Sequence, residues 1–523
     1  MKRFVAFALT CMLLVCMFPA LAETAPSTSK LITDEPVTLT VATIDNPYTA
    51  SPLTPDLPVW KYLEEITGVH IEFETYSADQ YVTAMTTRLG AGVELPDIID
   101  MPVSFSDAYQ YGKDGIVIQL NDLLEEYGTY YKQTLADKPK LESLMKGLDG
   151  EIYYLSTVRD EEMASGPYGW VIRKDWLDKL GLEEPKTLDD WYAVLKAFKE
   201  KDPNGNGVAD EIPMTNYSGL SQMLVWGNVW GLHLRQSGGF YPDDNGVVQY
   251  EFIDERAKEM LAWLNKLYTE GLYDMEAITN TRSQFTSRMS SDIAGAAIAW
   301  QETTTTWNGA LKASGVEDAH WVLTAIPTVE GYTPLLETSG MSNGIISISK
   351  NCQNPKVAMK WLDYVMYSEE CAKLMTLGLE GTTYTEENGE ITMTEFITNN
   401  PDGLGPVEAV RSLGAWQYFP FRLYSKYVTL LKMNDPEHVE RAAAYIPYIV
   451  DAFEEGIATE EEMDIVSRKL TDIQTYVEEM CTKFIINQAS LDEWDSYVQT
   501  VKDMGIEDVL AVYRTQYERM NAE

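Results

Sequence analysis

The sequence predicts an α/β protein with more than one domain. Three observations indicate this class: 523 residues of which 45% are hydrophobic, strands that alternate with helices near the N-terminus, and the same alternation past residue 150. At roughly 100–200 residues per domain, the length corresponds to two to four domains that can each bury a core. Strands that alternate with helices favour a parallel sheet covered by helices on both faces.

The first alternating run spans residues 37–100. It begins with the β-branched strand "VTLTVATI" at 37–44. Four apolar residues of "PVWKYLEEITG" follow the i, i+3, i+4, i+7 spacing of an amphipathic helix, and Gly68 is placed to end that helix. The strand "VHIEFE", a helix through 81–89 and the short strand "PDIID" complete a β-α-β-α-β order.

The second alternating run follows residue 167. "YGWVIRKDWLDKLGL" predicts an extended segment and then a helix, which Asp175 is expected to cap and Gly181 to end. "PKTLDDWYAVLKAFKEK" predicts another helix, because Thr187 and the acidic Asp190 three residues later form a near capping box. From Glu408 to the end, helical spacing dominates and strands are scarce.

Residues 1–22 have the order of a secretory signal peptide. Lys2 and Arg3 precede the apolar run "FVAFALTCMLLVCMFPA", and small residues at 20–22 predict cleavage before Glu23. A membrane helix is the alternative, but the run is short and broken by Pro19. The mature chain is therefore expected to work after export, in the periplasm or at the outer face of the cytoplasmic membrane.

Two further features belong to this N-terminal region. "LLVC" resembles the bacterial lipobox, so lipidation at Cys16 is an alternative to cleavage before residue 23, although Val15 is larger than the usual residue there. Residues 23–35, "ETAPSTSKLITDE", are polar and rich in Pro, Ser and Thr, which indicates a flexible leader.

The charge balance of the mature chain excludes two classes of partner. Removal of Lys2 and Arg3 from the 40 basic residues leaves 38 against 81 acidic residues, a formal charge of −43. Such a surface repels nucleic acid and anionic lipid. Without the two cysteines of the signal region, Cys352, Cys371 and Cys481 remain, so at most one disulfide can form.

The sequence carries no convincing catalytic motif. It lacks a Walker loop, a His-Glu-x-x-His pair and a Cys-x-x-Cys pair. "GMSNG" at 340–344 fits the G-x-S-x-G elbow of a nucleophilic serine, but that elbow follows a strand and opens a helix. Here the strand-like "IISIS" comes after it, so Ser342 is not expected to be a nucleophile.

The segment "KDPNGNGVADEIP" at 201–213 predicts a calcium site. A calcium loop supplies oxygen ligands from positions 1, 3, 5, 7 and 9, with glycine at position 6 for a sharp turn. Gly207 occupies the sixth position, and Glu211 replaces the usual carboxylate at position 12, which is Pro213 here. The alternative is an Asn/Gly turn without an ion. The expected ligands are Asp202, Asn204, Asn206, Val208 through its carbonyl, Asp210 and Glu211.

Aromatic residues are abundant, with 13 Trp and 31 Tyr. Their rings offer an apolar face to sugar C–H groups and a polar edge through N–H or O–H. Most are expected in the core, but those near Gly, Asn and Thr are candidates for ligand contact. These candidates are Tyr168, Trp170, Trp226, Trp230, Trp300, Trp307 and Tyr384.

Several of these segments together resemble the extracellular solute-binding proteins of ATP-driven sugar importers, in particular the alginate-oligosaccharide-binding and LipO-like lipoprotein branch. Residues 171–213, "VIRKDWLDKLGLEEPKTLDDWYAVLKAFKEKDPNGNGVADEIP", resemble that branch almost throughout. "LPDIIDMP", "AYQYGKDGIVIQL", "AGAAIAW", "NPKVAMKWLDYVMYSEE" and the ending "LDEWDSYVQTVKDMGIEDVLAVY" are individually weaker matches in the right order.

The resemblance implies a two-lobed periplasmic-binding-protein fold of type II, each lobe a sheet flanked by helices, with a helix-rich C-terminal part. We expect residues 36–155 and 325–385 to form the N-terminal lobe. Residues 156–324 and 386–523 would form the C-terminal lobe, which carries the calcium loop 202–211. The resemblance also implies that the calcium is structural and remote from the cleft.

Five residues are expected at the ligand by this resemblance and by strand ends. "AIAW" places Trp300, and "EGTTY" places Tyr384, where members of the family contact sugar. Asp45 and Asn46 follow the first strand, and Asp100 ends "PDIID", so these three fall where open α/β sheets bind ligands.

Two classes of function follow. The first is a monomeric, non-catalytic protein that captures an oligosaccharide in the cleft between the lobes and delivers it to the permease of an ABC transporter. The second is a secreted carbohydrate-active enzyme, a lyase or a glycosidase. Peptide capture on the same scaffold is a further alternative, which would require charged anchors for both termini of the peptide.

Overall fold

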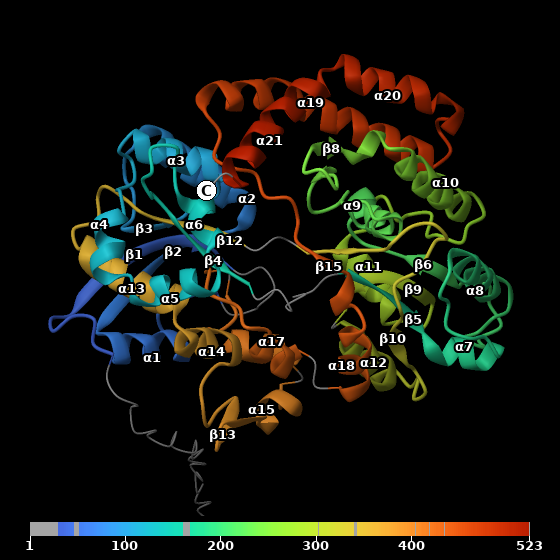
Figure 1. Ribbon diagram of the computed structural model, residues 1–523. Helices are drawn as coiled ribbons and strands as arrows, with labels where there is room; N and C mark the ends of the chain where they lie inside the picture. Colours follow the sequence, from blue (N-terminus) through green and yellow to red (C-terminus); the bar gives the residue numbers. More distant parts are fainter. Residues whose placement is uncertain are drawn as a thin grey trace, which may run out of the picture.

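The computed structural model describes residues 30–45, 52–159, 168–301, 303–338, 342–402, 404–417, 419–432 and 435–521. Two lobes lie side by side, each built around its own β-sheet (Figure 1). The expected signal peptide at 1–22, the candidate lipidation site Cys16 and the candidate ligand residue Asn46 lie outside the described residues.

The first lobe contains a five-stranded sheet in the order β2-β1-β3-β12-β4. β1 pairs in parallel with β2 and β3, as expected, but β12 is antiparallel to both β3 and β4. The sheet is therefore mixed, because β12 enters from the second lobe in the opposite direction. The strands are β1 (Val37–Ile44), β2 (Val69–Tyr76), β3 (Ile98–Asp100), β4 (Leu155–Val158) and β12 (Ser342–Ile348).

Helices from two separate parts of the chain cover this sheet. The earlier group is α1 (Pro58–Thr67), α2 (Ala78–Ala91), α3 (Phe105–Lys113), α4 (Asn121–Tyr127), α5 (Thr129–Asp137) and α6 (Lys140–Met145). The later group is α13 (Pro355–Tyr367), α14 (Glu369–Leu377), the hairpin β13 (Tyr384–Glu387) and β14 (Glu390–Met393), α15 (Glu395–Thr398), α16 (Pro406–Ser412) and α17 (Ser425–Lys432). α1 ends where predicted, at Gly68, whose φ of 74° favours glycine.

The second lobe contains a four-stranded sheet in the order β10-β5-β9-β6. β5 is antiparallel to both β9 and β10, and only β6 is parallel to β9, so the expectation of a parallel sheet is wrong for most of this lobe. The strands are β5 (Tyr168–Arg173), β6 (Ile212–Thr215), β9 (Ala294–Trp300) and β10 (Trp321–Leu323).

The second lobe is richer in helices. Around its sheet lie α7 (Lys174–Leu180), α8 (Leu188–Glu200), α9 (Gly219–Met223), the 3₁₀ helices η1 (Leu224–Trp230) and η2 (Glu251–Ile253), α10 (Glu255–Thr269), α11 (Arg282–Met289), α12 (Thr303–Ala313), α18 (Pro436–Ala443) and η3 (Ile446–Tyr448). Short strand pairs join β7 (Phe240–Pro242) to β8 (Val248–Tyr250) and β11 (Leu336–Glu337) to β15 (Ile449–Val450).

The C-terminal helices lie along one edge of the molecule, at the top of Figure 1. They are α19 (Glu460–Ile485), η4 (Leu491–Glu493), α20 (Trp494–Asp503) and α21 (Ile506–Asn521). α19 packs on α10 of the second lobe, and the backbone N–H of Ala458, just before α19, donates to Ser106 Oγ of the first lobe at 2.9 Å. The C-terminal helices thus contact both lobes.

Helix caps test two local predictions. Thr187 forms the predicted capping box with Asp190 at the start of α8, with both reciprocal hydrogen bonds present. Asp175 does not cap α7, because Arg173 occupies the N-cap position. Instead, the Asp175 carboxylate accepts two hydrogen bonds from the buried Arg173 guanidinium, at 2.8 and 2.6 Å. A buried cation has a stronger demand for a carboxylate than a helix terminus has for a cap.

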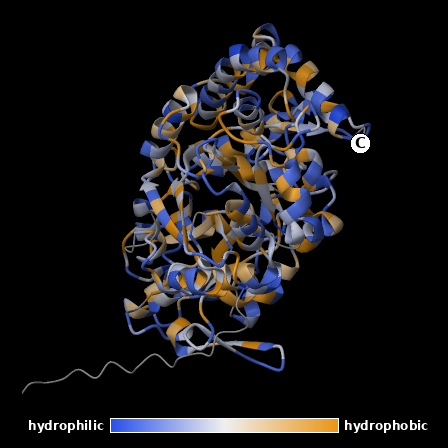
Figure 2. Ribbon diagram, turned by 90° about the vertical axis from the view of Figure 1, so that its left-hand side faces the viewer, coloured by the Kyte–Doolittle hydropathy of each residue, from blue (hydrophilic) through white to orange (hydrophobic). Residues whose placement is uncertain are grey.

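Each lobe has a separate hydrophobic core. Figure 2 shows hydrophobic strands in the interior, and outer helices along which hydrophilic and hydrophobic residues alternate. Residues from Ile397 to Leu431 pack into the core of the first lobe, whereas the expected division assigned this segment to the second lobe. Its helices α16 and α17 continue the packing of α14. Only from α18 onward does the chain return to the second lobe.

Within the described ranges, none of the helices combines the length and apolar character that crossing a bilayer requires. Three cysteines in these ranges, Cys352, Cys371 and Cys481, are free thiols. Cys371 belongs to the first core and Cys481 to the second, so these two cannot pair with each other.

Candidate functional site

Three aromatic side chains meet at one end of the second sheet. Tyr168 begins β5 and Trp300 ends β9, and the antiparallel register places the two residues opposite each other. Their ring centroids lie 4.6 Å apart. Trp300 Nε1–H donates to the Tyr217 hydroxyl at 3.1 Å, and the hydroxyls of Tyr168 and Tyr217 are 3.0 Å apart. The sequence predicted Tyr168 and Trp300 as ligand residues, and the fold brings them together.

Two arginines surround this aromatic cluster. The Arg235 guanidinium lies 4.2 Å from the centroid of the Tyr168 ring, and its Nη2 donates to the Tyr168 hydroxyl at 3.1 Å. The Arg282 guanidinium lies 5.6 Å from the centroid of the Tyr217 ring. Burial raises the pKa of Tyr168, although both guanidiniums act in the opposite direction. The phenol is therefore neutral and can donate or accept a hydrogen bond.

A hollow of about 660 Å³ adjoins the cluster. Tyr217 and Arg235 line it from the second lobe, together with residues before α11 and one face of α19. Aromatic faces beside hydrogen-bonding groups are typical of sites that bind sugars or other polar ligands with apolar faces. Sequence reasoning missed Tyr217, Arg235 and Arg282. Only the position of Tyr217, two residues after a strand, was a usable signal.

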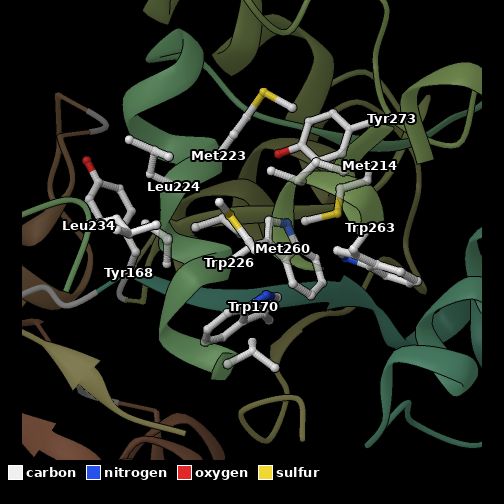
Figure 3. Close-up of a cluster of buried hydrophobic side chains, with 14 of the residues drawn as sticks. Tyr168, Trp170, Met214, Met223, Leu224, Trp226, Leu234, Met260, Trp263 and Tyr273 are labelled. Atoms are coloured by element: carbon white, nitrogen blue, oxygen red, sulfur yellow. The ribbon is translucent and has the colours of Figure 1, made fainter. Parts of the chain in front are cut away.

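Three of the predicted aromatic contacts, Trp170, Trp226 and Trp230, lie in the core of the second lobe. Trp170 and Trp226 are fully buried, and Figure 3 shows Trp226 among Trp170, Trp263 and Met260. Trp230 is 3% exposed and donates through Nε1 to Glu259 at 3.1 Å. All three pack in the hydrophobic core of the second lobe, and ligand contact by them stays a prediction.

Trp307 and Tyr384 are also buried. Trp307, 4% exposed, packs edge-on against Phe285 and Trp321 with centroids 5.7 Å apart in each pair. Tyr384 begins the β13–β14 hairpin and packs into the first core, with 4% of its surface exposed. Ligand contact by Trp307 and Tyr384 stays a prediction. The presence of polar neighbours in the sequence, which we used to select candidate aromatic residues, does not distinguish a ring that faces the core from one that is exposed.

Two acidic candidates lie at strand ends of the first lobe. The Asp45 carboxylate accepts from the backbone N–H of Leu53 at 3.0 Å. Asp100 ends β3, and its Oδ2 accepts from Thr43 Oγ1 at 2.9 Å. Burial raises the pKa of Asp100 to about 7, against a smaller opposing effect of the Thr43 hydrogen bond. Ligand contact by Asp45 and Asp100 stays a prediction.

A second hollow of about 800 Å³ lies between the lobes. The segment from α5 to α6, including Lys138 and Lys140, lines it on the first lobe. Tyr241, Phe453 and Tyr517 line it from the opposite side. The space between the lobes is therefore large enough for a drug-sized or sugar-sized ligand.

The predicted calcium loop is folded tightly upon itself. Asp202 accepts from the backbone N–H groups of Asn206 and Gly207 at 3.1 and 3.0 Å. The side-chain amides of Asn204 and Asn206 both lie 3.2 Å from the carboxylate of Asp210. Gly207 has a φ of 74°, which provides the sharp turn expected at this position.

The charges in this loop fit a hard cation. Glu211 Oε1 is shielded from water and has no hydrogen-bond partner among the described residues. Burial raises the pKa of Glu211, and the neighbouring carboxylates of Asp202 and Asp210 raise it further. A cation would compensate these charges. Among the described residues, no group of three or more His, Cys, Asp and Glu side chains is arranged to hold a metal. The expected ligands of this loop, however, also include two side-chain amides and the Val208 carbonyl, which are oxygen ligands that calcium accepts.

The loop lies at the opposite end of β5 from the aromatic cluster. Asn204 Nδ2 donates to the carbonyl of Asp292 at 3.1 Å, and the Asp292 carboxylate pairs with Arg173 at 2.5 Å. Arg173 ends β5, whereas Tyr168 begins it. Five residue steps separate them, which is roughly 16 Å along a strand. An ion in the loop would therefore stabilise the lobe without touching a ligand at Tyr168.

The predicted elbow serine is part of a strand. Ser342 begins β12, which runs to Ile348 and pairs with β3 and β4. A nucleophile elbow requires a turn into a helix at this point. The backbone at Ser342 therefore lacks that geometry.

The fold and the arrangement of strand ends between two lobes define the class of protein. Residues 46–370 match the family of bacterial extracellular solute-binding proteins, and the chain belongs to this family. It is 27% identical over 510 residues to the fructooligosaccharide ABC transporter substrate-binding protein FusA of Streptococcus pneumoniae, which covers 90% of this chain and 89% of FusA. It is 28% identical over 349 residues to lipoprotein LipO of Bacillus subtilis, with 65% and 66% covered.

Solved structures show the same fold. The crystal structure of the alginate-binding protein AlgQ2 without calcium ion matches with a TM-score of 0.77 and 25% identity, over 94% of this chain and all of AlgQ2. The structure of FusA with kestose matches with a TM-score of 0.72 and 24% identity, over 93% and 99%. The predicted family and the predicted two-lobed α/β fold are confirmed.

Proposed function

We propose that this protein captures an oligosaccharide between its lobes and delivers it to the permease of an ABC transporter, without catalysing a reaction. The observation that carries this proposal is the cluster of Tyr168, Tyr217 and Trp300 at the strand ends of the second sheet. Its rings supply an apolar face, and its hydroxyls supply hydrogen bonds beside a hollow. FusA, a fructooligosaccharide ABC transporter substrate-binding protein solved in complex with kestose, supports a sugar as the ligand.

The alternative functions have weaker support. A lyase or glycosidase needs groups poised for proton transfer beside a bound sugar. The family and its named relatives are binding proteins, which favours capture over turnover. Peptide capture would place charged anchors at both ends of the ligand, and the aromatic cluster itself favours a sugar.

Calcium is part of the proposal as a structural ion. Asp202, Asn204, Asn206, Asp210, Glu211 and the Val208 carbonyl would hold it. The shielded, unpartnered oxygen of Glu211 supports this assignment. Similar proteins have been studied for bound ions: AlgQ2 was solved without calcium ion, and FusA was solved as an EF-hand mutant. When bound, the ion would neutralise the loop's carboxylates and fix its turn against Asp292.

The cellular setting is also proposed. The signal-like residues 1–22 support export, with cleavage before Glu23 or lipidation at Cys16. The similarity to lipoprotein LipO supports retention at the outer face of the cytoplasmic membrane. We propose that the protein acts as a monomer there and meets the permease when loaded.

A binding screen tests the function. The Tm of the purified secreted chain is measured by thermal unfolding in the presence of neutral oligosaccharides, acidic oligosaccharides and short peptides. A ligand at a hundred times its dissociation constant adds about 2.7 kcal/mol of stability, so a binder raises Tm. We expect sugars and not peptides to raise Tm, and no new reducing ends or unsaturated products to form. Product that increases with protein concentration would instead identify an enzyme.

A further inference from the structure

Arg235 differs from most other arginines that the structure describes, because no ion pair joins it to an acidic side chain of the described residues. Nine of them, Arg173, Arg288 and Arg441 among them, form ion pairs with Asp or Glu. Arg235 donates only through Nη2, to the Tyr168 hydroxyl, and its Nε and Nη1 have no hydrogen-bond partner in the described chain. In a chain with 81 acidic and 40 basic residues, an arginine without a carboxylate is unexpected.

The position of Arg235 shows where a carboxylate could come from. The residue is half-buried and lines the hollow of about 660 Å³ beside the proposed sugar site. Glu478 also lines this hollow, but it is exposed on α19, where water screens its charge. Arg282 adds a second guanidinium at the Tyr217 ring. The hollow is therefore lined by the Arg235 guanidinium, which no acidic side chain of the described residues pairs with.

We infer that Arg235 binds a carboxylate of the ligand, so that the preferred oligosaccharide is acidic, as in a chain of hexuronic acids. This inference rests on the proposed function and adds the charge of the ligand. A planar guanidinium can hold a carboxylate through two parallel hydrogen bonds, a geometry that sugar hydroxyls match less well. Nε and Nη1 are shielded from water in the structure without ligand. Binding of the carboxylate would therefore require the guanidinium, which lies 4.2 Å from the Tyr168 ring centroid, to turn toward the hollow.

The overall charge of the protein makes this local cation necessary. The field of a strongly acidic protein opposes the approach of an anion. A short-range, charge-assisted pair inside a partly dry pocket can exceed that repulsion because nearby charges there are screened less by salt. A neutral sugar can accept hydrogen bonds from the guanidinium but would leave its charge uncompensated.

The test compares matched ligands on the intact secreted protein. Oligouronides of two to four residues and several linkages are titrated by calorimetry beside their carboxyl-reduced, neutral counterparts and beside neutral gluco- and fructo-oligosaccharides. We expect the tightest binder to be an oligouronide, with its reduced counterpart at least about tenfold weaker, the loss expected for a hydrogen bond to a charged group. A neutral sugar that binds as tightly or more tightly overturns the inference and leaves the proposed function intact.

Variants assign the effect to one side chain. Arg235→Gln should remove the preference, so that acidic and reduced sugars bind equally, while Arg235→Lys keeps part of it. Arg468→Gln is the matched control, because it removes the same charge from an exposed position on α19. Melting curves without ligand show that each variant is folded. An unchanged preference in Arg235→Gln contradicts the role of Arg235, and a panel in which no sugar binds contradicts the proposed function itself.

Discussion

Trp226 and Trp300 belong to the same lobe but have different environments. Trp226 is fully buried, with Trp170, Trp191 and Trp263 packed edge-on around it at centroid distances of 5.7–5.9 Å. Trp300 is half-buried at the end of β9, and its Nε1–H reaches a neighbouring hydroxyl. Burial therefore assigns one ring to stability and leaves the other available to a ligand.

Replacing each tryptophan should separate these two roles. Trp226→Ala leaves a large cavity and should lower the free energy of unfolding by about 3–5 kcal/mol. Trp300→Ala should weaken binding of the best oligosaccharide by about 2 kcal/mol, roughly thirty-fold in Kd. Urea unfolding and calorimetric titration measure the two effects. Trp300→Phe retains a ring and serves as control, and unchanged affinity in Trp300→Ala would remove this residue from the site.

Asp100 should make the stability depend on pH. Its folded pKa of about 7 exceeds the ordinary value of an aspartate, so the native state binds more protons than the unfolded state between about pH 4 and pH 7. Stability should fall as pH rises through this window, by at most about 4 kcal/mol at about 1.4 kcal/mol per pKa unit.

Unfolding in urea at several pH values checks this prediction. The free energy of unfolding of Asp100→Asn should not fall across this pH window. The stability of the variant relative to the wild type should therefore be higher at pH 8 than at pH 4. Asp56→Asn is the control, because Asp56 is largely exposed. Parallel pH profiles for the wild type and Asp100→Asn would show that Asp100 ionises without a penalty.

At the scale of single elements, the local sequence predicted several helix and strand boundaries correctly. β1, the end of α1 at Gly68 and the capping box of α8 follow from neighbouring residues alone, because propensity and capping act over a few positions. Asp175 shows the limit of such reasoning. Its partner Arg173 is close in sequence, but the demand that overrides capping is the burial of Arg173, which depends on the whole lobe.

The calcium loop is the element with the most direct test. Removal of the ion leaves the carboxylates of Asp202, Asp210 and Glu211 facing one another. A chelator should therefore lower Tm, by the equivalent of about 2.7 kcal/mol if calcium was present at a hundred times its dissociation constant. Asp202→Ala should abolish the response to chelator, as followed by scanning calorimetry.

A nearby surface change controls for general effects of charge. Asp189→Ala removes an exposed carboxylate at the start of α8, outside the loop, and should leave the chelator response intact. Sugar affinity should change little when calcium is removed, because the loop and Tyr168 lie at opposite ends of β5. If chelator leaves Tm unchanged and no metal copurifies, the loop is a turn without an ion.

At the scale of the whole molecule, the order of strands could not be deduced from local patterns. β12 joins the first sheet after the chain has traversed the second lobe, and residues from Ile397 to Leu431 return to the first core. An amphipathic helix shows which of its faces is apolar but not which sheet it covers. For the same reason, local patterns could not reveal the candidate site. It is formed by residues distant in sequence, Tyr217, Arg235 and Trp300, which come together only when β5, β6 and β9 pair.

The two separate cores predict a change of shape on binding. The lobes are joined by connections such as β4 to β5 and β10 to β12, so they can rotate as rigid bodies while each core stays packed. Only a ligand that contacts both lobes binds the closed form better, and only such a ligand shifts the population. Small-angle scattering should therefore show a smaller radius of gyration with the best oligosaccharide, approaching the roughly 24 Å of a single compact body of this length.

The Trp300→Ala variant distinguishes closure from simple compaction. At a sugar concentration that saturates the wild type but not the variant, the variant should keep the larger radius, because fewer molecules carry a ligand that draws the lobes together. Raising the sugar to saturate the variant should restore part of the decrease. A radius that is the same with and without saturating ligand in the wild type would mean that the lobes are already held in one arrangement. In that case, the contact between Ala458 and Ser106 would be the first to examine by substitution, since it joins the C-terminal helices to the first lobe.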